Sequence, residues 1–353
     1  MTLAKDAELT TSKRIVVAVG VAVWGVFWLL RDIIVERSPI TDFDQVWYAA
    51  RAVMDGVSPY TVIGPGRPFP LEYDFYYPLP AALIAVPLGM LPLLAARITF
   101  VAVSSALFAW TFLGAGWFRW PVFLSASFLI SAAAAQWTPL LLAATLWAPL
   151  AWVLIAKPNV ALAMAPAGSA RQRLIAVVGG AIILALSFIV DPNWIMEWLA
   201  ALGRGEHFLP LILHVTTGGP LLALALLKWR RWEAWLLLAF AVIPHSVTIY
   251  ETLALYLIAR SRQETLALAV CSAVAFFWQG TIDNTTWTAY LKQLADIVLI
   301  TMYLPALVLV LKLPNEGDVP AFLERGVDRW PAWLRGRAGS SQPSAPGSRP
   351  SAA

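Results

Sequence analysis

Long apolar segments dominate this chain and restrict its possible folds more than any other feature. A membrane-spanning helix needs about 20 mainly apolar residues. Ten segments fit that description: 14–34, 78–95, 98–117, 120–135, 138–156, 174–190, 207–227, 232–246, 264–281 and 287–311. Two shorter apolar segments, 158–168 and 247–259, either cross obliquely or re-enter between other helices. The sequence therefore predicts an all-α, polytopic membrane protein with about 10–12 membrane helices.

Composition agrees with a bilayer environment. Hydrophobic residues make up 59% of the chain and charged residues 13%, whereas soluble domains carry about 25% charged residues. The net charge of +4 comes from basic residues scattered between apolar segments, so we expect no nucleic-acid partner. The single cysteine, Cys271, excludes an internal disulfide and a thiolate metal cluster. Segment 14–34 is too long for a cleavable signal and is predicted to be a retained anchor.

The Lys and Arg residues between the spans predict an orientation, because cytoplasmic loops carry an excess of them. With a cytoplasmic N-terminus and both short segments crossing, the basic turns fall on the inner side. They are Lys5, Lys13 and Arg14, then Arg97, Arg171 with Arg173, Lys228 with Arg230 and Arg231, Arg260 with Arg262, and the basic tail. Both termini are then cytoplasmic, and the longest loop, 35–77, lies on the outer face of the cell membrane.

The chain is expected to form three regions. Residues 1–313 make the transmembrane domain. Residues 314–338 are predicted to form a cytoplasmic interfacial helix, since they include Trp330, Trp333 and several Arg residues. Residues 339–353 are rich in Ser, Pro, Gly and Ala and are predicted to be disordered.

The outer loop contains a predicted interfacial helix that begins at Asp42 and ends at Gly56. Its apolar residues recur with helical spacing, Asp42 suits the N-cap and Gly56 suits the C-terminal stop. From the residues alone, Asp42 is either a helix cap or a reactive carboxylate. The helix is too short to cross a bilayer, so we expect it to lie along the membrane surface.

The polar face of this helix carries Asp44, Tyr48, Arg51 and Asp55, at spacings that allow pairing. Asp44 is expected to be either a solvated surface carboxylate or a substrate contact. Arg51 either pairs with Asp55 or clamps a phosphate. Two hypotheses therefore stay open for Asp44 and two for Arg51.

Three further polar residues lie at the predicted outer ends of apolar segments. Lys157 is isolated there, where basic residues are disfavoured, and either binds a phosphate or only ends its span with a snorkelling side chain. His245 either binds phosphate or an acceptor, or is an ordinary satisfied polar residue. Glu251 is costly near hydrocarbon unless it is paired, so His245, Tyr250 and Glu251 are predicted to form one polar cluster.

Several short motifs, in order along residues 42–260, resemble glycosyltransferase family 87. The first comprises Asp42-Phe43, Tyr48-Ala49-Ala50-Arg51-Ala52 and Gly56-Val57-Ser58-Pro59-Tyr60. The second is Tyr76-Tyr77-Pro78-Leu79-Pro80, followed by a span bounded by Pro87 and Pro92. The later ones are Ala135-Gln136-Trp137-Thr138-Pro139-Leu140, Lys157-Pro158-Asn159, and Pro244-His245-Ser246 with Tyr250. Leu79 and Ala135 replace a proline and a glycine that are usual in the family.

The resemblance implies a GT-C-type helical bundle that acts as a glycosyltransferase at the outer face. The donor is then a polyprenyl-phosphate sugar, with mannose favoured over arabinose, and the acceptor is a hydroxyl of a glycolipid or glycan. Asp42 carries over as the general base of an inverting single displacement. The candidates for binding donor phosphate or substrate are Lys157, His245, Arg51, Tyr48, Tyr77, Gln136, Glu251 and Asp44.

No cofactor and no metal are expected. Asp42-Phe43-Asp44 has the Asp-x-Asp spacing that holds a divalent cation with nucleotide-sugar donors, but a lipid-phosphate donor removes that requirement. Two other classes of protein remain. A transporter or lipid flippase would show ionisable residues at mid-span and matching broken helices in two halves, and a scaffold subunit would keep the fold without activity.

Overall fold

The computed structural model describes residues 10–36, 40–71, 73–205, 208–282 and 286–317, together with Pro331 and Arg335. Within that part the chain is helical and has no strand, only one isolated bridge between Ile63 and Phe69. The all-α prediction is therefore confirmed. The predicted interfacial helix at 314–338 and the predicted disordered tail at 339–353 lie almost entirely outside the described residues.

The described elements include both α-helices and tighter 3₁₀ segments. The α-helices are α1 (Thr11–Val35), α2 (Asp42–Met54), α3 (Pro59–Val62), α4 (Leu79–Gly89), α5 (Leu93–Phe112), α6 (Ala126–Ala133), α7 (Thr138–Leu146), α8 (Pro158–Met164), α9 (Ala170–Val190), α10 (Trp194–Arg204), α11 (Trp232–Val242), α12 (Arg262–Gln279), α13 (Trp287–Val298) and α14 (Leu304–Lys312). The 3₁₀ segments are η1 (Leu113–Ala115), η2 (Trp117–Leu124), η3 (Ala148–Ala156), η4 (Ala165–Ala167), η5 (Leu211–Leu213), η6 (Val215–Thr217), η7 (Gly219–Lys228) and η8 (Ile249–Leu257). A π-helical turn, η9 (Leu299–Tyr303), joins α13 to α14.

Four helices in the described part are long and apolar enough to cross a membrane: Thr11–Val35, Leu93–Ala115, Ala170–Val190 and Ala289–Lys312. The bent pair α6 and α7 makes a fifth if it counts as one span. These helices fit a multi-pass membrane protein, but they are fewer than the predicted 10–12. Most of the other predicted spans are divided into shorter helices, several of them at Pro or Gly.

The long helices present apolar side chains outward. On α9, Val177 and Ile189 are 69% and 78% exposed, and on α1 Val16 is 71% exposed. Water would strongly disfavour such surfaces, whereas lipid does not. The structure therefore turns hydrocarbon-compatible faces outward around a packed interior.

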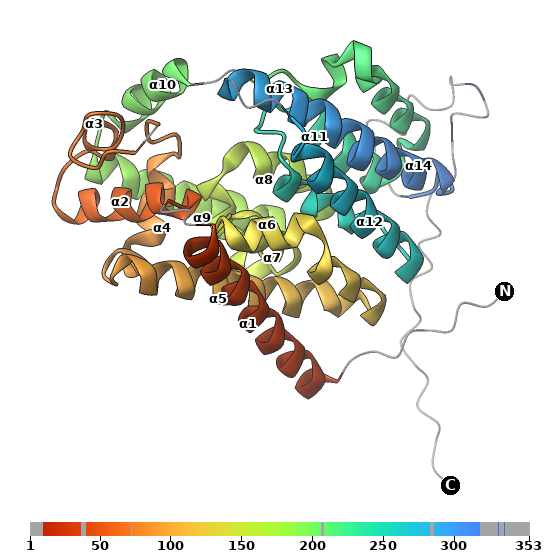
Figure 1. The fold of residues 1–353 in the computed structure, drawn as a ribbon, viewed down its shortest axis with the longest axis horizontal. Coiled ribbons are helices and arrows are strands. Elements are labelled where there is room, and N and C mark those ends of the chain that lie inside the picture. Colours follow the sequence, from red (N-terminus) through yellow and green to blue (C-terminus); the bar gives the residue numbers. More distant parts are fainter. Residues whose placement is uncertain are drawn as a thin grey trace, which may run out of the picture.

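Helices α1 and α5 pack side by side and run in opposite directions (Figure 1). The guanidinium of Arg14, at the start of α1, donates to the carbonyl of Trp110 near the end of α5. At the other end, the first turn of α5 lies beside α2, where Arg97 pairs with Asp44. The prediction that Arg97 lies across the membrane from loop 35–77 is therefore wrong. Segment 78–95 does not cross, because α4 ends at Gly89 and the chain turns back beneath α2.

Helix α2 confirms the predicted helix at 42–55, with one correction. Thr41, not Asp42, is the N-cap, and Asp42 is the first helical residue. Gly56 ends the helix at φ +69°, in the left-handed region that favours glycine. The indole N–H of Trp47 donates to the carbonyl of Leu91 at 3.1 Å, which fixes α2 against the α4–α5 turn.

The predicted span 138–156 is not one helix. Helix α7 packs against η3, with a break at Trp147. Gln136 and Lys157, which flank the segment 138–156 on either side, both lie beside Asp42. The segment therefore leaves this end of the molecule and returns to it. Both ends can approach the same carboxylate only because the chain folds back on itself.

Candidate functional site

Four segments that are distant in the sequence converge beside the start of α2. They supply Asp42, Gln136, Lys157 and Glu251. Tyr77 lies close enough to Asp42 and Glu251 for their charges to act on its hydroxyl. Five of the sequence-predicted site residues thus come together. We call these residues, with His245, the Asp42 cluster.

Asp42 is held by the break between α6 and α7. Its carboxylate accepts a hydrogen bond from the side-chain amide of Gln136, and its backbone N–H donates to the carbonyl of Ala134 at 3.1 Å. The chain bends by 114° between the two helices. Between them Ala135 has φ +49°, a conformation that costs an L-residue roughly 1–2 kcal/mol and that glycine adopts freely. Ala135 occupies the position at which glycosyltransferase family 87, whose motifs the sequence resembles, usually has glycine.

Lys157 and Glu251 form a buried ion pair next to Asp42. Lys157 Nζ lies 2.5 Å from Glu251 Oε1, and the Glu251 side chain is 1% exposed. The hydroxyl of Ser246 donates to the same oxygen at 3.2 Å. Lys157 is therefore a paired cation inside the protein, and the alternative of a snorkelling lysine is wrong.

His245 lies on the other side of Glu251. Its Nδ1 donates to the carbonyl of Ile243 at 2.8 Å, because a carbonyl only accepts. Its Nε2 then faces Glu251 Oε2 at 3.6 Å and the Tyr303 hydroxyl at 3.4 Å. The predicted cluster of His245, Tyr250 and Glu251 is confirmed: the charges of Asp42 and Glu251 act on Tyr250, and Lys157 Nζ lies 5.9 Å from its ring centre.

Sequence reasoning missed Tyr303. It belongs to the π-helical turn η9, a feature that often occurs at functional sites. Nothing in the local sequence marks a π-turn, because Leu299–Tyr303 is as apolar as its neighbours. Only the contact of the Tyr303 hydroxyl with His245 in the structure identifies Tyr303 as part of the site.

The electrostatics of the cluster favour a proton acceptor. Burial raises the pKa of Asp42 above the ordinary aspartate value, whereas the Gln136 hydrogen bond and the Lys157 charge oppose this rise. Burial, together with the Asp42 charge, also raises the pKa of Tyr77 well above its ordinary value. Tyr77 therefore stays neutral at physiological pH and can donate a hydrogen bond. A carboxylate with a raised pKa is better matched to base catalysis near neutral pH.

Asp44 lies outside this cluster, although it is two residues from Asp42. It is 1% exposed, and both oxygens are engaged by Arg97, with Arg97 Nε at 2.8 Å from Oδ1. The backbone N–H and hydroxyl of Thr41 donate to the same carboxylate at 2.9 and 2.8 Å. The expectation of a solvated surface carboxylate is wrong, and the geometry separates Asp44 from Asp42.

Two other predicted residues also lie apart from the cluster. Arg51 is exposed, and its guanidinium lies 5.7 Å from the Trp47 ring and 3.5 Å from the carbonyl of Gly89. The predicted pair of Arg51 with Asp55 does not form. Tyr48 packs its ring on Phe69, with 4.8 Å between the centres.

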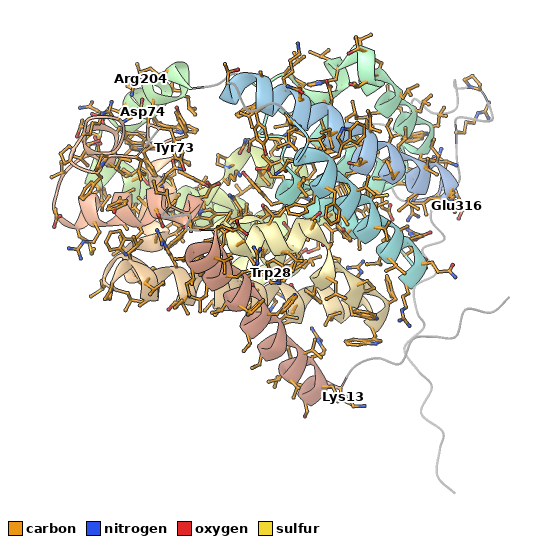
Figure 2. All side chains as sticks on the ribbon, viewed as in Figure 1. Lys13, Trp28, Tyr73, Asp74, Arg204 and Glu316 are labelled. Atoms are coloured by element: carbon orange, nitrogen blue, oxygen red, sulfur yellow. The ribbon has the colours of Figure 1, made fainter. Side chains whose placement is uncertain are left out.

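Helix α10 fastens the part of the loop that carries Tyr77. Figure 2 shows Arg204 beside Asp74, where Arg204 Nε lies 2.6 Å from Asp74 Oδ2. The indole N–H of Trp198 donates to the carbonyl of Tyr76 at 2.9 Å. These contacts hold residues 74–77 at the end of the molecule where α2, α3 and α10 gather (Figure 1).

An apolar cavity of about 150 Å³ is lined in part by sequence neighbours of two residues of the Asp42 cluster. Phe43 and Trp137, the neighbours of Asp42 and Gln136, line it together with Ile84, Leu88 and Phe100. Its lining is almost entirely carbon. A polar site therefore adjoins a hydrocarbon-lined space.

No group of three or more His, Cys, Asp or Glu side chains in the described ranges is close enough to hold a metal ion. Asp42 and Asp44 do not share a ligand position, because Asp44 turns to Arg97. What the cluster offers is one carboxylate of raised pKa, one ammonium, one imidazole and neutral donors.

Comparisons of the chain with protein-family models, with curated proteins and with solved structures find no match. The fold defines a helical, multi-pass membrane protein with a polar cluster at one end. The likeness to glycosyltransferase family 87 rests on the sequence motifs alone.

Proposed function

We propose that this protein is a membrane glycosyltransferase that moves a sugar, with mannose favoured, from a polyprenyl-phosphate donor to a hydroxyl of a glycolipid or glycan. The proposal rests on one observation: residues of the motifs that resemble family 87 meet in one cluster. A carboxylate of raised pKa stands there beside a cation, and sequence neighbours of two cluster residues line an apolar cavity.

Asp42, Lys157 and Glu251 each have a task in this reaction. Asp42 takes the proton of the acceptor hydroxyl as its oxygen attacks the anomeric carbon. The bond from that carbon to the phosphate oxygen breaks, and the prenyl phosphate leaves with the electron pair, so the sugar inverts its configuration. Lys157 stabilises the charge on the departing phosphate, while Glu251 fixes the position of Lys157.

The cavity lined by Phe43, Trp137 and Phe100 suits the first part of a prenyl chain, because its walls are apolar. Gln136 and neutral Tyr77 supply donors that orient hydroxyl groups or the carboxylate. No step needs a divalent cation, since Lys157 meets the phosphate charge.

Sugar transfer in proteoliposomes tests the proposal directly. Polyprenyl-phosphate sugars and nucleotide sugars are supplied in parallel to the wild type, to Asp42→Asn and to Asp55→Asn. We expect transfer only from the lipid donor, and a loss of about 10²–10⁴-fold for Asp42→Asn, the usual contribution of a positioned base. Asp55 is the exposed C-cap residue of the same helix, so Asp55→Asn is the matched control and should keep its rate.

Three outcomes would contradict parts of the proposal. An unchanged rate in Asp42→Asn removes the base, and transfer only from nucleotide sugars removes the donor. Loss of rate with EDTA removes the metal-independent mechanism. Movement of labelled lipid between leaflets without any sugar transfer would favour a flippase instead.

A further inference from the structure

A second cavity, mainly apolar but with a group of polar side chains in its wall, lies apart from the Asp42 cluster. It measures about 370 Å³ and is lined by residues of the 208–216 segment, by α13 and by Val247. Val247 follows Ser246, whose hydroxyl bonds Glu251. The segment that begins at His245 therefore separates the two sites, and the proposed transfer reaction uses no residue of the second one.

The polar wall of this cavity is a fixed histidine–carboxylate pair. His214 is 8% exposed, and its Nδ1 lies 2.7 Å from Asp296 Oδ1. The hydroxyl of Thr217 donates to the same oxygen at 2.8 Å. An ionised carboxylate only accepts hydrogen bonds, so the His214 proton sits on Nδ1. Nε2 is left for another partner, and none of the described residues provides one.

Lys292 completes the polar part. It lies one helical turn before Asp296 on α13, is exposed, and lines the same cavity. His214 and Thr217 hold Asp296 through Oδ1, and the cavity offers an anionic ligand the ammonium of Lys292 and the outer edge of the imidazole. Lys292 Nζ is a donor to phosphate oxygens, and Nε2, with the proton on Nδ1, is an acceptor for the P–OH of a phosphate monoester.

The rim of the cavity is apolar and outward-facing. Leu209, Leu213 and Val215 are 51%, 54% and 72% exposed, and all three line the cavity. A free anion gains nothing from these side chains, whereas acyl chains do. The polar wall and the apolar rim together favour an amphiphilic ligand whose head group carries a phosphate.

We propose that the cavity of His214, Asp296 and Lys292 binds the phosphate group of an anionic membrane lipid, with the acyl chains lying along Leu209, Leu213 and Val215. This site goes beyond the proposed transferase activity, since it includes no residue of the Asp42 cluster.

Lipid binding to the purified protein in detergent tests this site without any sugar donor, so its failure and that of the transferase proposal are distinguishable. Native mass spectrometry compares dioleoyl phosphatidic acid with dioleoylglycerol, which has the same chains and no phosphate. We expect phosphatidic acid to bind and dioleoylglycerol not to bind. Lys292→Gln and His214→Gln should each weaken binding at least about tenfold, the effect of losing one hydrogen bond to a charged group.

Lys312→Gln is the matched control, because Lys312 is also exposed on the α13–α14 run but lies at its far end; it should bind like the wild type. Lys292 is on the surface, so Lys292→Gln is expected to fold even if His214→Gln does not. Equal binding of dioleoylglycerol, unchanged affinity in Lys292→Gln, or displacement by inorganic phosphate at the lipid's own concentration would each overturn the proposal.

Discussion

Asp42 and Asp44 are two residues apart, and their surroundings give them opposite properties. Asp44 is enclosed by Arg97 and Thr41, which satisfy its oxygens. Asp42 has one amide partner in Gln136 and a pKa raised by burial. The sequence could propose both carboxylates but could not rank them, because the ranking depends on partners 53 and 94 positions away.

The pH dependence of transfer tests the link between Lys157 and Asp42. The Lys157 charge lowers the pKa of Asp42, so removing it in Lys157→Gln should raise that pKa. The base must be ionised, so we expect the acidic limb of kcat/KM to move to higher pH, in addition to a lower maximum rate. Lys312→Gln serves as the control. A uniform loss at every pH, without movement of the limb, would mean that the Lys157 charge does not control the pKa of Asp42.

Asp42→Asn should also stabilise the protein. A carboxyl group whose folded-state pKa is raised costs stability when it is ionised, and the cost disappears as the pH falls below its unfolded-state value. Asparagine keeps an oxygen for Gln136 and carries no charge. We expect the melting temperature in detergent to rise near neutral pH, with a difference that shrinks towards acidic pH. A lower melting temperature at pH 7 would show that ionised Asp42 supports the fold.

At the scale of elements, local patterns predicted α2 well but predicted the apolar segments less well. The start and end of α2 depend on its own residues, such as Gly56. Segments 78–95 and 138–156 have no such signal, since a helix buried in protein is as apolar as one in lipid. Hydropathy therefore identified these apolar segments in the sequence, but it did not predict the residues at which each segment bends.

The ion pair of Asp44 with Arg97 should be essential for docking α2 on α5. Removing one partner of a buried pair leaves the other charge without compensation, and this typically costs about 3–5 kcal/mol. We expect Asp44→Asn to lose about that much in chemical unfolding in detergent, and Asp44→Leu combined with Arg97→Met to lose less. Glu36→Gln removes one partner of the exposed pair with Arg31 and should cost at most about 1 kcal/mol. Equal costs for Asp44→Asn and Glu36→Gln would contradict this role.

At the scale of the whole molecule, two errors in the predicted path cancel. Segment 78–95 was expected to cross and does not, and segment 138–156 was expected to cross and folds back. Each error reverses the side of the chain that follows, so Lys157 still arrives at the end where α2 lies. The basic turns at the other end stay together: Arg231 and Arg260 share Glu233, and Arg262 lies over the Trp120 ring at 5.3 Å.

The orientation of these two ends is testable by labelling. Lys13 and the loop that contains Asp74 lie far apart in Figure 2. In a Cys271→Ser background, we expect an impermeant thiol reagent to label Pro65→Cys in intact cells, because the distribution of Lys and Arg predicts that this loop is outer. Lys13→Cys should react only after the cells are opened, because the positive-inside rule places it in the cytoplasm. The reverse pattern would turn the Asp42 cluster to the cytoplasm and remove an externally displayed donor.

The sequence by itself determined that this chain is a helical membrane protein, that a short helix begins near Asp42, and that polar residues such as Lys157 and Glu251 need partners. These properties follow from the transfer of side chains out of water and from local backbone preferences, which act over a few residues. Only the tertiary structure decided that Gln136 and Lys157 both reach Asp42, that Asp44 belongs to Arg97, and that Tyr303 meets His245. Those contacts depend on where broken helices turn, and packing between distant segments sets the turns.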